Sequence, residues 1–295
     1  MRLDASAIDQ VARSLEALVA LDEHPVRNLP GVFSISFGSF PALMTAASPR
    51  TSHLVGSLVV FGGYANFTDT CRFMSGAVSP RNGEPQPDPT CMVGLAVNMA
   101  RVLFHGEEGR KLAHAWLAFL SRVWGVPEMT RPERFSEVAL QLAADLPADL
   151  AQTFLQGCGV VPGFASLVEE ARARIDVEAM DPRRDLHAIR CPVYLFHGRG
   201  DDVIPCSQME ELAAGLSGAH TKSYLTGLYD HSRGRSAAMA FARLPALFGE
   251  IKTMAAMMHA LVLGGTRVRP VEGRAPSSTQ PKEITSRQDA PASLS

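Results

Sequence analysis

Gly31-Val-Phe-Ser-Ile-Ser-Phe-Gly-Ser39 is the stretch from which the fold is best predicted. Its apolar part, Val32 to Ser36, predicts a short buried strand, and the residues from Phe37 to Ala47 predict the helix that follows. Ser36 therefore stands at a sharp turn from strand to helix, where a strand exposes its last side chain. The same spacing is also typical of small residues that only let a helix pack close to a strand, so both interpretations stay open.

Two further apolar segments, Leu58 to Phe61 and Val193 to Phe196, predict strands of the same kind, and Thr221 to Leu225 predicts a fourth strand more weakly. Between the last two, Ser207 and Glu210 have the spacing of a capping box and predict the start of a helix. Strands that alternate with helices favour a parallel sheet flanked by helices, which places the chain in the α/β class.

Residues 86–185 interrupt this alternation, because they contain helical patterns and no convincing strand. We expect them to form an all-helical cap insertion over the functional edge of the sheet. Met and aromatic side chains recur in this region at helical spacing, which is more typical of core than of a ligand pocket. The helical patterns cover Met92 to Phe104, Lys111 to Val123, Phe135 to Leu142 and Ala165 to Ile175.

The domain organisation follows from these patterns. Residues 1–85 and 186–265 are expected to form the α/β core, with residues 86–185 as the insertion. Residues 266–295 are rich in Pro, Ser, Thr, Gln and charged residues, so they are predicted to be a disordered tail that buries too little apolar surface to fold.

An acid and a histidine follow the later strands. Asp201 and Asp202 come directly after the strand that ends near Phe196, and His231 lies in the loop after the weakest strand. Taken singly, paired aspartates make turns and a loop histidine is solvated. Jointly with Ser36, each falls just beyond the C-terminal end of a predicted strand, where open parallel sheets place their sites. This shared placement predicts a Ser-His-Asp triad.

The chemistry of such a triad needs three converging groups. A serine hydroxyl becomes a nucleophile when a base accepts its proton and a third group holds that base in the correct tautomer. The backbone N–H that follows the serine, here that of Phe37, points at the developing oxyanion.

The later part of the chain strongly resembles the C-terminal half of α/β-hydrolases of the esterase, lipase and dienelactone-hydrolase-like kind, and residues 31–70 look like the nucleophile strand of that fold and the strand after it. This resemblance implies Ser36 as nucleophile, His231 as general base and Asp201 as its orienting acid, with Asp202 as the near substitute. The elbow pattern Gly-x-Ser-x-Gly has Ser34 in its first position. The resemblance rests on Pro192-Val-Tyr-Leu-Phe-His-Gly198, Asp201, Ile204-Pro205 and Asp230-His231.

The chain also departs from that family. Its members build four strands before the nucleophile strand and take a second oxyanion donor from the loop after the third, whereas only about thirty residues precede Val32 here. The expected fold is therefore a truncated α/β-hydrolase-like sheet. Its nucleophile strand becomes an exposed edge, which invites pairing with another chain and favours a homo-oligomer.

Composition limits the partners. A formal net charge of -2 gives no case for a nucleic-acid or membrane partner. The five cysteines lack zinc or redox spacing, and the histidines show no metal-binding grouping, so neither a metal nor a cofactor is predicted. Reduced thiols and the absence of a secretory signal in the first residues favour a cytoplasmic protein.

Two functions from different classes follow. The first is a serine hydrolase that acts on a small-molecule ester or other acyl compound through an acyl-enzyme. The second is a catalytically inactive, hydrolase-like binding or assembly module, suggested by the missing strands and by Ser34. A fragment of a longer protein is the third alternative.

Overall fold

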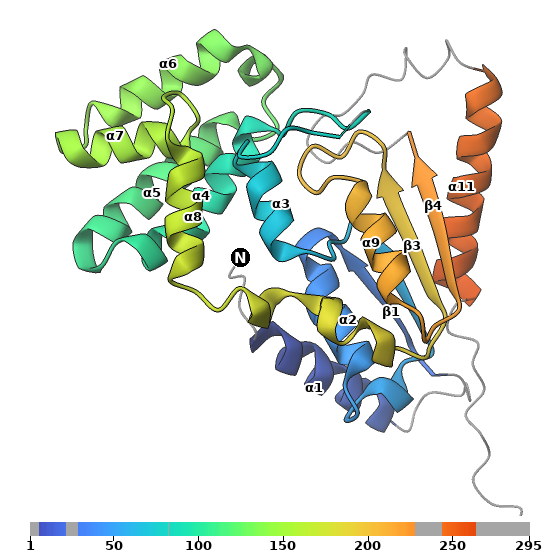
Figure 1. Ribbon diagram of the computed structural model, residues 1–295. Coiled ribbons are helices and arrows are strands. Elements are labelled where there is room, and N and C mark those ends of the chain that lie inside the picture. The colour runs from blue at the N-terminus through green and yellow to red at the C-terminus, as the bar shows by residue number, and fades with distance from the viewer. Residues whose placement is uncertain (1–5, 22–28, 82, 228–243, 264–295) are drawn as a thin grey trace, which may run out of the picture.

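A computed structural model describes residues 6–21, 29–81, 83–227 and 244–263. Its centre is a sheet of four parallel strands in the order β1-β2-β3-β4 (Figure 1). This confirms the α/β class and the parallel sheet. The strands are β1 (Gly31–Ile35), β2 (Ser57–Phe61), β3 (Val193–Gly198) and β4 (Thr221–Thr226).

Helices cover both faces of the sheet. Helices α2 and α9 pack on the face that carries Leu58 and Leu195, and α1 packs against α2. Helix α11 packs on the opposite face, over β3 and β4 (Figure 1). The bounds of these elements are α1 (Ser6–Ala20), α2 (Ser39–Ala47), α9 (Ser207–Gly215) and α11 (Leu244–Leu263).

Alternation along each strand explains the two faces. Successive side chains of a strand point to opposite sides, so Leu58 and Val60 face α2 and α9 while Val59 and Phe61 face the α11 side. Aromatic rings stack on the α11 face, where the ring centroids of Phe196 and Tyr224 are 4.8 Å apart. Because both faces bury apolar side chains, the inner strands read as nearly continuous apolar runs.

Between β2 and β3 the described residues form helices and no strand, as predicted. These helices form a layer beside the sheet (Figure 1). They are α3 (Phe67–Met74), α4 (Pro89–Leu103), α5 (Gly106–Val123), α6 (Pro132–Ala143), α7 (Ala148–Gly157) and α8 (Phe164–Ala173). Short 3₁₀ turns complete the chain, η1 (Ser36–Gly38), η2 (Ser52–Leu54), η3 (Pro127–Thr130), η4 (Glu178–Met180), η5 (Pro182–Arg184) and η6 (Leu186–Ala188).

Met and aromatic side chains of this helical region form core, as expected. Trp116 and Phe154 are fully buried, and the indole N–H of Trp116 donates to the carbonyl oxygen of Phe154 at 3.0 Å. The same cluster includes Phe40 of α2 and Ile204, so the helices and the sheet region share one core. Trp124 is the exception, because 59% of it is exposed.

The predicted capping box at Ser207 is wrong. Helix α9 begins at Ser207 itself, with Cys206 as its N-cap and without a side-chain hydrogen bond at the cap. The N–H of Ser207 instead donates to Oε1 of Glu84 at 3.2 Å. A carboxylate from a distant loop therefore takes the place that a local side chain was expected to fill.

Two expectations fall on residues outside the described ranges. These are the disordered tail at 266–295 and the position of His231.

Candidate functional site

Ser36 has a backbone conformation that serine rarely adopts. Its φ is 55°, and among the described residues it alone has a positive φ without being glycine. The preceding Ile35 is extended, with φ −128° and ψ 140°, and the chain enters η1 directly at Ser36. A left-handed conformation costs a residue with a Cβ roughly 1–2 kcal/mol, so the fold holds Ser36 in a strained strand-to-helix turn.

The residues two positions to either side of Ser36 have different roles. Ser34 is buried, and its hydroxyl donates to the carbonyl oxygen of Val59 at 3.3 Å, so it ties β1 to β2. Gly38 has a φ of −64°, and a Cβ built there meets no described atom within 4 Å. Neither conformation nor space requires glycine at position 38. The turn is defined by Ser36 itself rather than by its neighbours in the motif.

Helix α2 approaches the loop after β2 closely. A Cβ at Gly63 would lie 2.8 Å from the Cβ of Ser39, and the N–H of Tyr64 donates to Oγ of Ser39 at 3.4 Å. Contacts under 3.0 Å would force a shift, so position 63 has no room for a side chain. This contact fixes the start of α2, and with it the turn at Ser36, against the loop that follows β2.

Asp201 lies fully buried in the loop after β3. Its Oδ1 accepts hydrogen bonds from the backbone N–H groups of Val203 at 3.0 Å and Ile204 at 2.9 Å. Nε2 of His197 donates to the carbonyl oxygen of Ile204 at 2.9 Å and lies 3.5 Å from Oδ2 of Asp201. One carboxylate oxygen therefore holds the loop, while the other lies on the side of His197 and Gly62.

Asp202 is also buried, and its backbone bonds to the helical region. Its carbonyl oxygen accepts from the N–H of Asp88 at 2.9 Å, just before α4 begins. This bond ties the helical region to the loop after β3. The two aspartates are thus placed differently, although they are neighbours in the same loop.

The sheet register aligns the candidate residues. Ile35 is paired with Phe61, and Phe61 with Phe196. The next residues, Ser36, Gly62 and His197, therefore lie side by side at the C-terminal ends of β1, β2 and β3. Strands lie about 4.8 Å apart, so the backbones of β1 and β3 are separated by roughly 10 Å. Ser36 and Asp201 therefore share the C-terminal edge of the sheet, as predicted. His231 lies outside the described residues.

Gly62, which the sequence analysis did not single out, stands between them. Its φ is +59°, its N–H donates to the carbonyl oxygen of Phe196 at 2.8 Å, and a Cβ there would lie 3.2 Å from Oδ2 of Asp201. Glycine at this position therefore satisfies both a backbone conformation and the space that the carboxylate occupies. The signal that could have found it is the pair Gly62-Gly63 directly after a buried strand.

Gln208 was missed as well. It is almost fully buried on α9, and its Oε1 accepts from the N–H groups of Ala65 at 3.0 Å and Asn66 at 2.7 Å. A single amide oxygen thereby holds the loop that contains Gly62 and Gly63. No local pattern in the sequence marks this contact, because the residues lie more than a hundred positions apart.

Phe37 and Tyr64 join the turn to the helical region. The Phe37 ring lies 5.5 Å from the ring of Tyr64, measured between centroids. Tyr64 is fully buried, and its hydroxyl donates to the carbonyl oxygen of Met180 at 2.9 Å. Burial raises the pKa of Tyr64 above its ordinary value, so this hydroxyl stays protonated and keeps its donor role.

The cysteines are free and poorly suited to nucleophilic chemistry. Four are buried and Cys206 is half-buried. Burial raises the pKa of Cys71 to about 12 and that of Cys158 further. The thiolate is the reactive form, so these thiols are inert at neutral pH.

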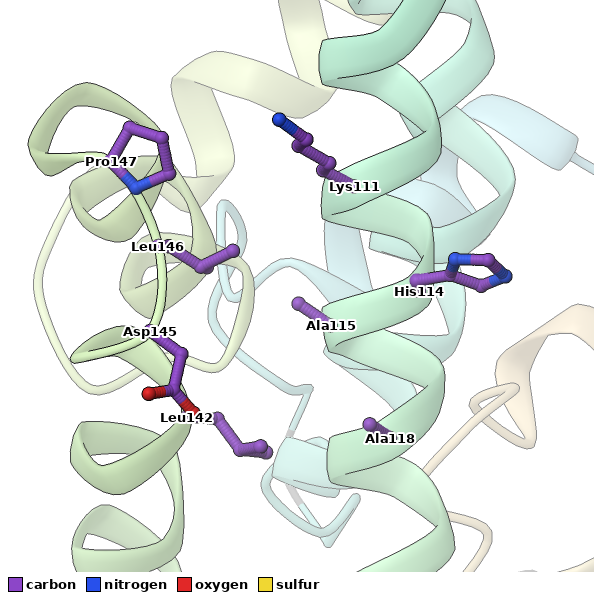
Figure 2. A pocket seen from close by; sticks show the side chains of 8 residues that line it. All are labelled: Lys111, His114, Ala115, Ala118, Leu142, Asp145, Leu146 and Pro147. Atoms are coloured by element: carbon purple, nitrogen blue, oxygen red, sulfur yellow. The ribbon is translucent and has the colours of Figure 1, made fainter.

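A surface hollow lies elsewhere, on the helical region. It is lined from α5, from the end of α6 and from the segment that joins α6 to α7, and Figure 2 shows Leu146 directed toward α5 across it. None of its lining residues is a candidate site residue. They are Lys111, His114, Ala115, Ala118, Leu142, Asp145, Leu146 and Pro147.

Within the described ranges, no group of three or more His, Cys, Asp or Glu side chains could hold a metal ion. No described helix is long and apolar enough to cross a membrane.

No protein-family profile and no curated protein matches this chain. Solved structures do resemble it. The 2,6-dihydroxy-pseudo-oxynicotine hydrolase matches with a TM-score of 0.40 and 16% identity, over 91% of this chain and 50% of that one. This chain thus spans half the length of that hydrolase.

Two further structures have similar scores. An esterase from Exiguobacterium antarcticum gives a TM-score of 0.37 at 16% identity, over 85% of this chain and 75% of that one. An alpha/beta hydrolase enzyme from a Medee basin deep-sea metagenome library gives 0.34 at 18%, over 80% and 70%. TM-scores this low assign neither a family nor an activity to this chain.

Proposed function

We propose that this protein is a serine hydrolase of α/β-hydrolase type, which cleaves an ester or another acyl compound through an acyl-enzyme. The observation that carries the proposal is the strained conformation of Ser36 at the end of β1, with φ 55°. A sharp strand-to-helix turn of this kind exposes a nucleophilic hydroxyl at the edge of a parallel sheet. A relaxed backbone, or glycine at position 36, would remove this strain and stabilise the fold. The strained serine therefore points to a functional role.

In the proposed mechanism His231 takes the proton of Ser36, and the hydroxyl oxygen attacks the acyl carbon of the substrate. The backbone N–H of Phe37 would stabilise the oxyanion. The leaving alcohol takes the proton back from His231, and a water molecule activated by the same imidazole then clears the acyl-enzyme. No cofactor or metal ion takes part in these steps.

Asp201 is the proposed acid that orients His231. Its buried position supports this role, because Oδ1 is fixed by two backbone N–H groups while Oδ2 lies next to Gly62, on the β2 side of the loop. A carboxylate held in this way can keep an imidazole in one tautomer and stabilise the imidazolium that forms.

The substrate is proposed to be a small acyl compound with an apolar acyl group. The ring of Phe37 next to Ser36 belongs to the apolar cluster that continues into the helical region, which would set the acyl specificity. Free thiols at all five cysteines support the expected cytoplasmic location.

The test is hydrolysis of a series of p-nitrophenyl esters of increasing acyl length. The wild-type protein should show turnover that Ser36→Ala abolishes, whereas Ser34→Ala should keep most of it, because Ser34 bonds to β2 rather than to substrate. Turnover that survives in Ser36→Ala, or that is absent from a folded wild-type protein with every acyl compound tried, would refute the proposal.

A second candidate, a hydrolase-like binding or assembly module without turnover, is favoured by one observation. No described strand flanks β1 on its outer side, so no loop of a neighbouring strand is seen to supply a second oxyanion donor there. Loss of one such donor costs on the order of 100-fold or more in turnover. Ligand binding that Ser36→Ala leaves unchanged, without any turnover, would favour this candidate.

A further inference from the structure

Within the part of the chain that the structure describes, no strand bonds to the backbone groups on the outer edge of β1. On β2 the N–H of Leu58 donates to the carbonyl oxygen of Pro192 on the β3 side, so the residues on either side of Leu58 bond toward β1. By the register and the alternation of the backbone, Gly31, Phe33 and Ile35 then direct their N–H and C=O groups away from β2. Among the described residues no strand pairs with this edge.

The side chains along this edge are apolar and exposed. Phe33 is 47% exposed and Ile35 is 50% exposed, and both lie on the α11 face of the sheet, in register with the buried Val59 and Phe61. Helix α11 packs over β3 and β4 and leaves this part of the face open. A fully buried ring or branched side chain is worth about 1.5–3 kcal/mol in transfer free energy, so covering these two would be favourable.

The opposite edge of the sheet differs. Strand β4 is largely polar and carries the exposed Lys222, whereas the five residues of β1 carry no charge. A lysine on an edge strand is a common means of preventing strand addition. One edge of this sheet is thus protected by charge and the other is not.

We propose that β1 pairs with β1 of a second copy of this chain, antiparallel and about a two-fold axis, to form a continuous eight-stranded sheet. A two-fold interface brings the same patch of both copies together, so it must complement itself. The neutral β1 meets this condition, because no like charges would face each other across the axis.

The register follows from the residues. With Phe33 on the two-fold axis, Phe33 faces Phe33 of the partner subunit, and Ile35 faces Gly31 of the partner subunit. All of these residues direct their backbone groups outward, so each opposed pair would exchange both hydrogen bonds. The two Phe33 rings would meet on the same face, and the absence of a side chain at Gly31 leaves room for Ile35.

Symmetry favours β1 of the second copy, rather than its β4, as the strand that pairs with β1. A β1-to-β4 contact would be heterologous and would leave a free edge at each end, which leads to open filaments. Lys222 on β4 disfavours that arrangement, while a β1-to-β1 contact covers the uncharged edge of the described sheet in each copy. Pairing uses no property of the Ser36 hydroxyl, so it stands or falls separately from catalysis.

Sedimentation equilibrium of the full chain tests the proposal. The wild-type protein should dimerise in the micromolar range, and Phe33→Lys should weaken the dimer at least about tenfold at low salt, because it places two like charges at the axis. Leu140→Lys is the matched control, since Leu140 is 54% exposed on α6, and it should leave the dimer intact. A wild-type monomer at about 100 μM, or equal effects of the two lysines, would overturn the proposal.

A cysteine scan tests the register even if the lysine variant folds poorly. Opposed residues that exchange hydrogen bonds have Cα atoms about 5.5 Å apart, which a disulfide can span. Phe33→Cys should therefore give a covalent dimer on mild oxidation. The wild-type chain and Ile35→Cys should not, because two residues at position 35 would lie about 13 Å apart along the strands. Equal cross-linking of Phe33→Cys and Ile35→Cys would contradict the register.

Discussion

Gly62 and Asp201 share one small space, because a Cβ at position 62 would lie 3.2 Å from Oδ2 of the buried carboxylate. Gly62→Ala should therefore disturb the acid as well as the backbone, whose φ is +59°. We expect a loss of about 1–2 kcal/mol in the free energy of unfolding from the strained φ alone, together with a drop in esterase turnover.

Gly76→Ala is the control for that change. Gly76 also has a positive φ, +69°, but a Cβ there meets nothing within 4 Å. Urea unfolding should show a loss of stability for both variants, with the loss in Gly62→Ala at least as large because of its contact with Asp201, while only Gly62→Ala should lower turnover. Equal turnover in the two variants would mean that the 62–201 contact has no effect on the site.

Ser36→Gly should make the protein more stable while removing its activity. Glycine adopts a φ of 55° without strain, but it also has more conformational freedom in the unfolded chain. The two effects leave a net gain of up to about 1 kcal/mol in the free energy of unfolding. Chemical denaturation measures this gain.

The same substitution at Ser121, inside helix α5, is the comparison. There the loss of helix propensity and of the hydrogen bond to Ala118 should lower stability by about 0.5–1 kcal/mol. If Ser36→Gly lowers the free energy of unfolding by the same amount as Ser121→Gly, the backbone at Ser36 is not strained in the folded protein.

Asparagine substitutions separate the two aspartates. Asp201→Asn keeps an oxygen that can accept from Val203 and Ile204, so the fold should survive. Turnover should fall on the order of 10⁴-fold, the scale of such a change in a serine triad. Asp202→Asn should keep turnover within a few-fold, because Asp201 rather than Asp202 is the proposed acid. Steady-state kinetics decides between them, and the reverse ranking would make Asp202 the acid.

Stability should fall in alkaline solution partly because of Cys71. Burial raises the pKa of this thiol to about 12 in the folded protein. The unfolded chain releases the proton near pH 8.5–9 while the folded chain keeps it, so the unfolded state binds fewer protons in this window. The free energy of unfolding should then fall by up to about 1.4 kcal/mol per pH unit above pH 9. Below that pH the thiol contributes no slope.

Cys71→Ala isolates this contribution. Urea unfolding at pH 8, 9 and 10 should show a shallower decline in the variant than in the wild-type protein, although the variant is less stable at every pH because of the cavity it creates. Parallel declines would show that the thiol ionises equally in both states.

The elements that the sequence predicted best are those specified by local pattern. Short apolar runs marked β2 and β3 within one or two residues, because strands buried on both faces need apolar side chains at every position. The run from Val32 also marked β1, but the expectation that this strand is buried was wrong, because β1 lies at the edge of the sheet and only Ser34 in it is buried. The turn at Ser36 was also predicted, since it falls where a strand pattern changes to a helix pattern.

Long-range contacts explain what was missed. Oε1 of Glu84 bonds the N–H of Ser207 and replaces the predicted capping box, and Gln208 holds the N–H groups of Ala65 and Asn66. These partners are far apart in the chain, so no window of sequence contains both. The space that Gly62 leaves for Asp201 is likewise visible only once two strands are in register.

The most direct test of the central claim is to react the folded protein with a fluorophosphonate and map the modified residue by mass spectrometry. The account predicts one label per chain, on Ser36, lost in Ser36→Ala and strongly slowed in His231→Ala. Labelling of a different serine, or of none in a protein that hydrolyses esters, would contradict it.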